Sequence, residues 1–306
     1  MSKRSLKNVA HSVHQRLLNK ARESNRPFNE LLQYYAMERF LYRLSLSPYA
    51  DSFVLKGALM LPLWRGSATR PTRDIDLLGE MDNAPRAVAG AVRDICTQEV
   101  EPDGLRFEAD SVETRTIAHD AEYRGVRVRF NGYLGSAVVH MQVDVGFGDV
   151  VCPGPDLLKY PAILDLPQPA LRTYTRETVI AEKLQAMVKL GELNSRMRDF
   201  YDIWLLSEYF EFDGPVLSEA VKRTFDARDT EIARLPVTFT EEFASDERNQ
   251  NLWRGFLRKS RIQGPPRDFK DVVAAVERFI EPVLGALSGG EIVEDKWPAA
   301  GPWASQ

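Results

Sequence analysis

The 306-residue sequence has very little cysteine and histidine. Its two cysteines, Cys96 and Cys152, cannot build a disulfide framework, and the four histidines show no metal-ligand spacing, so we interpret His140 and His119 as structural. No apolar run approaches the roughly 20 residues that a membrane-spanning helix needs. The N-terminal residues MSKRSLKNVAHSVHQ contain no apolar core of a secretory signal. These absences predict a cytoplasmic protein without structural disulfides, zinc or a membrane anchor.

The charge of the chain is unevenly spread. Hydrophobic residues make up 44% of the sequence and charged residues 27%, as in ordinary globular proteins, and the length suggests about two domains. The net charge is −4, yet residues 1–48 hold nine basic and three acidic residues, a local excess of +6. A second basic run comprises Arg254, Arg258, Lys259, Arg261, Arg267 and Lys270. Such patches suit a polyanionic partner such as RNA, although a solvated helix face is the simpler interpretation of each patch alone.

The stretch from Lys56 to Gly79, KGALMLPLWRGSATRPTRDIDLLG, carries the clearest chemical pattern. An apolar run turns at Lys56-Gly57, and a short amphipathic segment and a basic loop follow. The run from Asp74 to Leu78 alternates polar and apolar residues, which predicts a strand. Side chains two apart on a strand share a face, so Asp74 and Asp76 should lie side by side. Paired carboxylates suit Mg²⁺, with phosphates as further ligands, although a solvated strand rim is the alternative.

A third carboxylate follows on a later predicted strand. Helical periodicity predicts helices over residues 6–24, 28–46 and 84–97, and alternation predicts strands over residues 105–109, 111–117, 125–134 and 138–145. Asp144 lies at the end of the last strand. On a strand beside Asp74 and Asp76 it would complete a two-metal site; alternatively it only begins a turn at Gly146.

Five prolines within residues 150–169 predict a domain boundary. We expect N-terminal helices over residues 1–48 that pack on a core over 49–150. A helical C-terminal domain over 151–290 and a tail over 291–306 should follow. The expected class is α+β, with a mixed sheet, flanking helices and a helical domain.

Two predicted helices of the C-terminal domain contain further candidate site residues. Thr175 should cap a helix over residues 177–190 that Gly191 ends, and Lys183 falls inside its apolar arc. This lysine could point into a polar cleft, or extend to the surface and pair with Glu182 or Glu192. Asn194 should cap the next helix, on which Asp199 and Asp202 share one face. These acids could face a cleft, or form a surface network with Arg196 and Arg198.

Together the segments KGA, RPTRDIDLL, VDVGFGD, ETVIAEKLQAMVKLG and NSRMRDFYDIWLL resemble the nucleotidyltransferase AbiEii/AbiGii toxin family. The resemblance extends over most of the chain. It implies a nucleotidyltransferase-like mixed sheet joined to a helical domain, and a toxin of a type IV toxin–antitoxin or phage-defence system with a cognate antitoxin. It also implies a nucleoside triphosphate substrate, Mg²⁺, and transfer of a nucleotide to RNA, at the tRNA 3′ end.

The resemblance also implies roles for individual residues. Lys56, Gly57 and Ala58 would contact phosphate, although the family usually has Gly or Ser where this chain has Ala58. Asp74 and Asp76 would hold metal, and strand position adds Asp144. Lys183 would contact the triphosphate, and Asp199 or Asp202 would assist catalysis. Arg70 and Arg73 could meet phosphate or RNA. Two other functions stay open, a catalytically silent nucleotide-binding or interaction module and a small-molecule nucleotidyltransferase.

Overall fold

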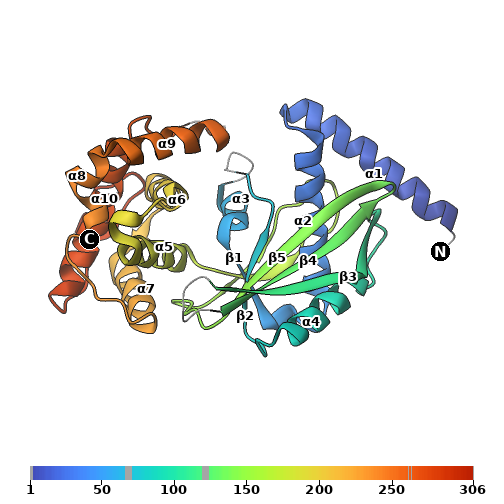
Figure 1. The fold of residues 1–306 in the computed structure, drawn as a ribbon, viewed down its shortest axis with the longest axis horizontal. Coiled ribbons are helices and arrows are strands. Elements are labelled where there is room, and N and C mark those ends of the chain that lie inside the picture. Colours follow the sequence, from blue (N-terminus) through green and yellow to red (C-terminus); the bar gives the residue numbers. More distant parts are fainter. Residues whose placement is uncertain (1–2, 66–70, 119–123, 261, 263, 306) are drawn as a thin grey trace. The chain divides into compact units, whose positions relative to one another are not determined.

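Figure 1 shows the fold of the chain in a computed structural model, which describes residues 3–65, 71–118, 124–260, 262 and 264–305. Arg70 and His119 therefore lie outside the described residues. The chain divides into two compact units. The first consists of Met1–Gly148 and Asp156–Thr173, and the second of Asp149–Pro155 and Tyr174–Gln306.

The first unit is built on a seven-stranded mixed sheet, which confirms the predicted fold class. The strand order is β3-β4-β5-β2-β1-β7-β6. Strand β5 runs parallel to β2, and β1 runs parallel to β7, whereas the other neighbours are antiparallel. The strands are β1 (Phe53–Lys56), β2 (Ile75–Gly79), β3 (Leu105–Ala118), β4 (Arg124–Leu134), β5 (Ala137–Gly146), β6 (Asp156–Lys159) and β7 (Ala170–Thr173).

Helices cover one face of this sheet. Helix α2 (Phe28–Leu46) packs against β5, and α4 (Pro85–Thr97) packs against β3 and β4, while α1 (Lys3–Ser24) lies on α2 (Figure 1). Strand alternation explains the burial, because Val126, Val128 and Phe130 enter the core while Arg127 and Arg129 turn to the other face. The sheet therefore has one helix-covered face and one face lined with polar side chains.

The predicted helices of this unit are confirmed, and one predicted break is wrong. Helices α1, α2 and α4 match the predicted ranges closely. The two expected strands over residues 105–109 and 111–117 form one strand, β3, whose pairing with β4 shifts register between Glu108 and Glu113. The irregularity in the sequence marks a bulge and not a turn. Short elements η1 (Ala50–Ser52), η2 (Gly57–Leu59) and α3 (Met60–Arg65) complete the unit.

Part of the basic excess of residues 1–48 is buried in α2. Arg39 is 1% exposed, pairs with Glu38 and donates to the Pro167 carbonyl at 2.6 Å. Arg43 makes a two-contact pair with Asp103, at 2.6 and 3.1 Å. These arginines hold the fold together, so only the remaining basic residues are available to a polyanion.

The proline-rich stretch returns to the sheet. The helical domain predicted over residues 151–290 includes Asp156–Thr173, whereas the structure places this segment in the first unit as β6, β7 and their connection. Glu38 accepts the Ile163 N–H at 2.7 Å, and Leu164 and Leu171 join the hydrophobic core. The pairing of β7 with β1 explains why this segment belongs there.

The second unit is helical. The predicted cap is confirmed, because Thr175 accepts the Thr178 N–H, and Gly191, at φ 51°, ends α5. The predicted cap at Asn194 is wrong: α6 begins at Met197, and Asn194 accepts the Arg196 N–H in the turn before it. The elements are α5 (Arg176–Leu190), η3 (Gly191–Leu193), α6 (Met197–Tyr209), β8 (Phe212–Asp213), α7 (Gly214–Ala227), η4 (Val237–Phe239), α8 (Glu241–Ser245), α9 (Glu247–Ser260), α10 (Phe269–Ser288) and β9 (Lys296–Trp297).

The C-terminal residues belong to the second unit. Strand β9 pairs with β8, and the Trp303 ring stacks on Phe279 with ring centroids 5.8 Å apart. Both cysteines are unbridged and buried, and burial raises the pKa of the Cys96 thiol to about 12 and also raises that of Cys152. Among the described helices, none combines the length and apolar character needed to cross a membrane.

Candidate active site

A row of charged residues crosses the polar face of the first unit's sheet. The strand register pairs Arg115 with Arg127, Arg127 with Asp144, Asp144 with Asp76, and Asp76 with Lys56. Register partners on neighbouring strands share a face, so these five side chains form one line over β3, β4, β5, β2 and β1. Two acids lie at its centre with cations on both sides.

Asp74, the residue immediately before β2, lies close to the two central acids, Asp76 and Asp144. The loop that carries it is held by α2, because Tyr34 accepts the Thr72 N–H at 2.9 Å and Gln33 donates to the Arg73 carbonyl at 3.2 Å. Thr72 also donates its hydroxyl hydrogen to Asp74. One carboxylate oxygen from each of Asp74, Asp76 and Asp144 lies within 4.8 Å of the other two.

The three carboxylates fit a hard divalent cation. Their donor set is all oxygen, which is the preference of Mg²⁺, and their separation allows each to reach a common ion. Asp74 and Asp76 are partly exposed while Asp144 is buried at 7% exposure, so a ligand could approach from the open face. Asp144 lies inside β5 and not in a turn, so the alternative of a turn-initiating residue is wrong.

Arg127 is the site residue that sequence analysis missed. Its Nε and Nη2 donate to the two oxygens of Asp144 at 2.8 and 2.7 Å, and Gln142 donates to the same carboxylate at 3.4 Å. The hydrogen bonds of Arg127 to Asp144, with the charges of Asp144, Asp74 and Asp76, raise the pKa of Arg127. The alternation in Val126–Phe130 placed Arg127 on a polar face, but only the strand register places it opposite Asp144.

Gly57 lets the backbone pass close to Asp76. Its φ is +71°, and an added Cβ would fall 2.7 Å from the Asp76 Cγ and closer still to Oδ2, so a side chain there meets both strain and overlap. The turn therefore brings backbone next to a candidate metal ligand. Ala58, at 5% exposure, is buried in η2, whereas Lys56 ends β1 as the partner of Asp76.

Lys183, Asp199 and Asp202 form a buried ion cluster in the second unit. The Lys183 Nζ lies 2.8 Å from Asp199 Oδ1 and 2.8 Å from Asp202 Oδ2, and Arg196 Nε lies 2.7 Å from Asp199 Oδ2. Side-chain exposure is 16% for Lys183 but only 3% and 2% for the two acids. The acids share a helix face as predicted. The expected pair of Arg196 with Asp199 forms, with the Arg196 side chain 54% exposed, but both acids are buried and not on the surface.

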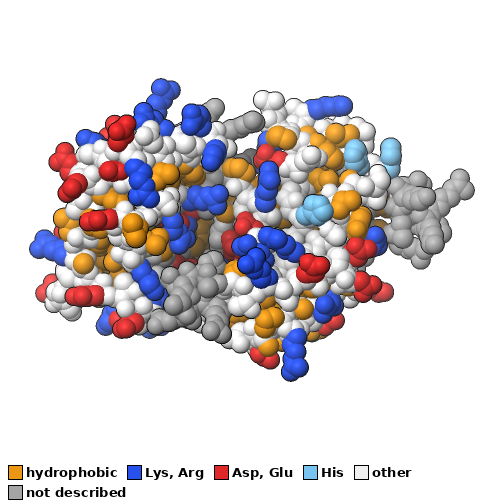
Figure 2. Space-filling view, viewed as in Figure 1, with side chains coloured by type: hydrophobic (Ala, Val, Ile, Leu, Met, Phe, Trp, Pro, Cys, Tyr) orange, Lys and Arg blue, Asp and Glu red, His pale blue; other side chains and the backbone are white. Residues whose placement is uncertain are grey.

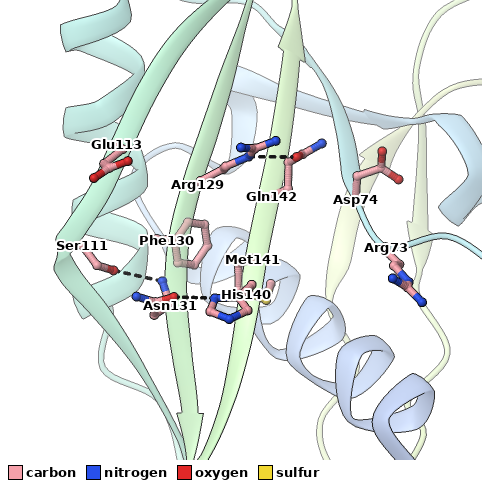
Figure 3. A pocket seen from close by; sticks show the side chains of 10 residues that line it. All are labelled: Arg73, Asp74, Ser111, Glu113, Arg129, Phe130, Asn131, His140, Met141 and Gln142. Carbon is pink, nitrogen blue, oxygen red and sulfur yellow. Dashed lines mark hydrogen bonds between the residues drawn. The ribbon is translucent and has the colours of Figure 1, made fainter. Parts of the chain in front are cut away.

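Arg73 lines a pocket on the polar face of the first unit, beside Asp74 (Figure 3). His140, interpreted above as structural, is exposed and lines the same pocket, which sequence spacing alone could not reveal. The exposed basic residues Arg16, Lys20 and Arg22 lie on α1, and Arg254, Arg258 and Lys259 lie on α9.

One solved structure supports the fold. The crystal structure of JHP933 from Helicobacter pylori matches with a TM-score of 0.50 and 15% sequence identity, over 85% of this chain and 95% of that chain. A second H. pylori structure matches with a TM-score of 0.48 and 15% identity, over 84% of this chain and 97% of that chain. A search among curated proteins finds no match.

The sequence also matches a protein-family model. Residues 39–275 match the model described as "Nucleotidyl transferase AbiEii toxin, Type IV TA system". The match spans most of the chain and contains the Gly57 turn, the three carboxylates on β2 and β5, and the Lys183 cluster. The fold, the acidic site and this match agree, and the chain belongs to the AbiEii nucleotidyl transferase toxin family of type IV toxin–antitoxin systems.

Proposed function

We propose that this protein transfers a nucleotide from a nucleoside triphosphate to the 3′-terminal hydroxyl of an RNA acceptor, the 3′ end of tRNA, with Mg²⁺ as cofactor. The observation that carries the proposal is the convergence of Asp74, Asp76 and Asp144 within 4.8 Å. Family membership supplies the reaction class. A modified tRNA 3′ end would block aminoacylation, which accounts for a toxin and for a cognate antitoxin as partner. Both substrates are cytoplasmic, so we expect the protein to act in the cytoplasm.

In the proposed reaction the acceptor hydroxyl oxygen attacks the α-phosphorus of the triphosphate. A new phosphorus–oxygen bond forms, the bond to the β-phosphate oxygen breaks, and pyrophosphate leaves with its electron pair. Bound Mg²⁺ would offset the charge of the triphosphate and lower the pKa of the attacking hydroxyl. The site carboxylates Asp74, Asp76 and Asp144 would hold the ions, and a carboxylate would accept the hydroxyl proton.

The Gly57 turn would position the phosphates. Because Gly57 brings the backbone of the turn against Asp76, a phosphate on a metal ion held by Asp76 would lie near this backbone, and Lys56 adds a positive charge at the end of β1. Ala58 lies buried, so we assign the closer phosphate contact to Gly57. Arg73 is a further candidate for phosphate or RNA.

Lys183, in the ion cluster of the second unit, would contact the triphosphate. In the structure this lysine is held by Asp199 and Asp202, so a phosphate contact would require it to share or exchange these partners. Asp199 or Asp202 would then assist catalysis, as a proton acceptor or as the group that positions Lys183.

The direct test is transfer from each of four α-³²P-labelled triphosphates to total tRNA, followed by mapping of the labelled position. We expect Mg²⁺-dependent label at the 3′ end, and none with Asp76→Asn. Triphosphate binding without label in any RNA would instead support a silent nucleotide-binding module. Label on a small metabolite but not on RNA would support a small-molecule nucleotidyltransferase.

A further inference from the structure

The polar face of the sheet contains a pocket that begins at Asp74 and extends over residues of β3, β4 and β5 to which the proposed function assigns no role. Its volume is about 530 Å³, within the usual range of roughly 300–1,000 Å³ for ligand pockets. Its lining comprises Arg73, Asp74, Ser111, Glu113, Arg129, Phe130, Asn131, His140, Met141 and Gln142. We propose that this pocket binds the unpaired terminal nucleotides of the acceptor RNA, a proposal that rests on the function above.

The position of the pocket relative to the carboxylates indicates that it binds the acceptor RNA and not the triphosphate. The acids lie on β2 and β5, in the middle of the strand order β3-β4-β5-β2-β1. Gly57 follows β1 on one side of them, whereas the pocket extends over β5, β4 and β3 on the other (Figure 3). In phosphoryl-type transfer the attacking and leaving oxygens lie roughly in line, on opposite sides of phosphorus. With phosphates at Gly57, the attacking hydroxyl must enter from the side of the pocket.

The chemistry of the lining suits nucleotides. Arg129 donates to Gln142 at 3.2 Å, and His140 Nδ1 and Asn131 Oδ1 lie 2.9 Å apart (Figure 3). The amides and the imidazole can both donate and accept, as the edges of a nucleobase require, and the guanidinium can bind phosphate or stack on a base. Arg129 and His140 are exposed, so their contacts can be exchanged for contacts to a ligand without loss of core packing.

The same lining argues for a single-stranded end. The major groove of an RNA duplex is too deep and narrow for side chains to read, and its minor groove is recognised mostly by shape, whereas unpaired ends can be splayed out and their base edges bound by amides and Arg. Phe130 and Met141, the hydrophobic members, are 3% and 1% exposed, so the pocket offers no apolar anchor site of the kind that protein partners use. Basic, acidic and histidine side chains are visible on this side of the first unit (Figure 2).

The test measures binding of a fluorescein-labelled single-stranded RNA octamer by anisotropy, in the full-length protein. Arg129→Ala and, separately, Asn131→Ala/His140→Ala should each weaken RNA binding by about 10- to 100-fold, as expected for removal of one or two base or phosphate contacts. The thermal shift given by Mg²⁺ with a non-hydrolysable triphosphate should stay at the wild-type value. Arg106→Ala is the matched control, since it removes an exposed charge from β3 outside the pocket lining.

The outcomes separate this inference from the proposed function. Wild-type RNA affinity in both Arg129→Ala and Asn131→Ala/His140→Ala, with folding confirmed by thermal melting, would overturn the pocket assignment even if transfer to RNA is observed. Loss of antitoxin binding without loss of RNA binding would overturn it too, in favour of a protein partner. Pocket-dependent RNA binding without transfer of any labelled nucleotide would uphold the pocket and reject the proposed reaction.

Discussion

At the residue scale, the charges of Asp74 and Asp76 should matter more to the chemistry than to folding. Asparagine keeps the size of each side chain and removes its charge, and the loss of a carboxylate relieves like-charge repulsion in the metal-free site. We expect Asp74→Asn and Asp76→Asn to fold and to lose at least about 100-fold in nucleotide transfer, the order of one lost transition-state contact. Transfer assays and melting with and without Mg²⁺ and triphosphate measure both effects.

Asp110→Asn is the control for this pair. Asp110 is an exposed acid on β3 outside the carboxylate cluster, so its replacement should leave transfer unchanged. Bound Mg²⁺ and triphosphate should raise the melting temperature of the wild type and of this control, by mass action on the folded state. If Asp74→Asn and Asp76→Asn both keep full nucleotide transfer and the full rise in melting temperature, the two acids are solvated carboxylates at the edge of the strand and do not bind metal.

A second prediction concerns Gly57. Alanine at φ +71° costs about 1–2 kcal/mol of conformational energy, and its Cβ would overlap Asp76. We expect Gly57→Ala to lower the free energy of unfolding by at least that amount and to weaken Mg²⁺ binding, as measured by denaturant titration and calorimetry. Gly90→Ala is the matched control, because nothing lies within 4 Å of its added Cβ in α4 and it should gain about 0.5–1 kcal/mol. Equal Mg²⁺ affinity in Gly57→Ala and wild type would contradict this role.

Glu38 makes stability depend on pH. Burial raises the pKa of its carboxyl to about 7 although Arg39 opposes the shift. Between pH 4.5 and 7 the folded protein therefore keeps a proton that the unfolded chain releases, so rising pH favours unfolding. Glutamine keeps the acceptor for Ile163 but does not titrate. The unfolding free energy of wild type relative to Glu38→Gln should fall as the pH rises from 4.5 to 8, in denaturant melts. A pH-independent difference would contradict the raised pKa.

At the scale of elements, Lys183 joins α5 to α6. Removing Lys183 leaves Asp199 and Asp202 as two buried like charges. The loss of one partner of a buried ion pair lowers the free energy of unfolding by about 3–5 kcal/mol. Lys183→Met should therefore lose stability as well as triphosphate affinity. The triple variant Lys183→Met/Asp199→Asn/Asp202→Asn should recover much of the stability but not the affinity. Recovery of affinity in the triple variant would show that Lys183 does not bind phosphate.

The elements show what could be predicted from sequence. Alternation placed Asp74 and Asp76 on one face, and helical spacing placed Asp199 beside Asp202, because both patterns are local. The Arg127–Asp144 pair and the joining of β7 to β1 depend on strand order and register, which no local pattern encodes. Likewise the helical spacing shows that Lys183 falls in an apolar arc, but it does not show the two acidic partners, which lie on another helix.

At the scale of the whole molecule, the chain passes between its units three times, after Gly148, Pro155 and Thr173. A fragment of residues 1–150 lacks β6 and β7 and leaves buried Glu38 and Arg39 without Ile163 and Pro167. We expect this fragment to aggregate or stay unfolded, because the buried Glu38–Arg39 pair loses its backbone hydrogen-bond partners and a buried ion pair is stable only when its remaining polar groups are satisfied. A fragment of residues 1–173 should yield more folded protein by circular dichroism. If both fragments unfold with equal cooperativity, residues 156–173 are not needed for folding of the first unit.

The burial of both cysteines has a practical consequence for spectroscopy. Cys96 and Cys152 are the only thiols in the sequence, both are less than 10% exposed, and burial raises both of their pKa values. The reactive species is the thiolate, so maleimide reagents should modify the native chain slowly. A cysteine introduced at Asp110 on β3, outside the pocket lining, or at Arg254 on α9, would therefore take a fluorophore selectively in the otherwise native background. A pair of such labels, one on each unit, would report by energy transfer whether the two units move when triphosphate and RNA bind.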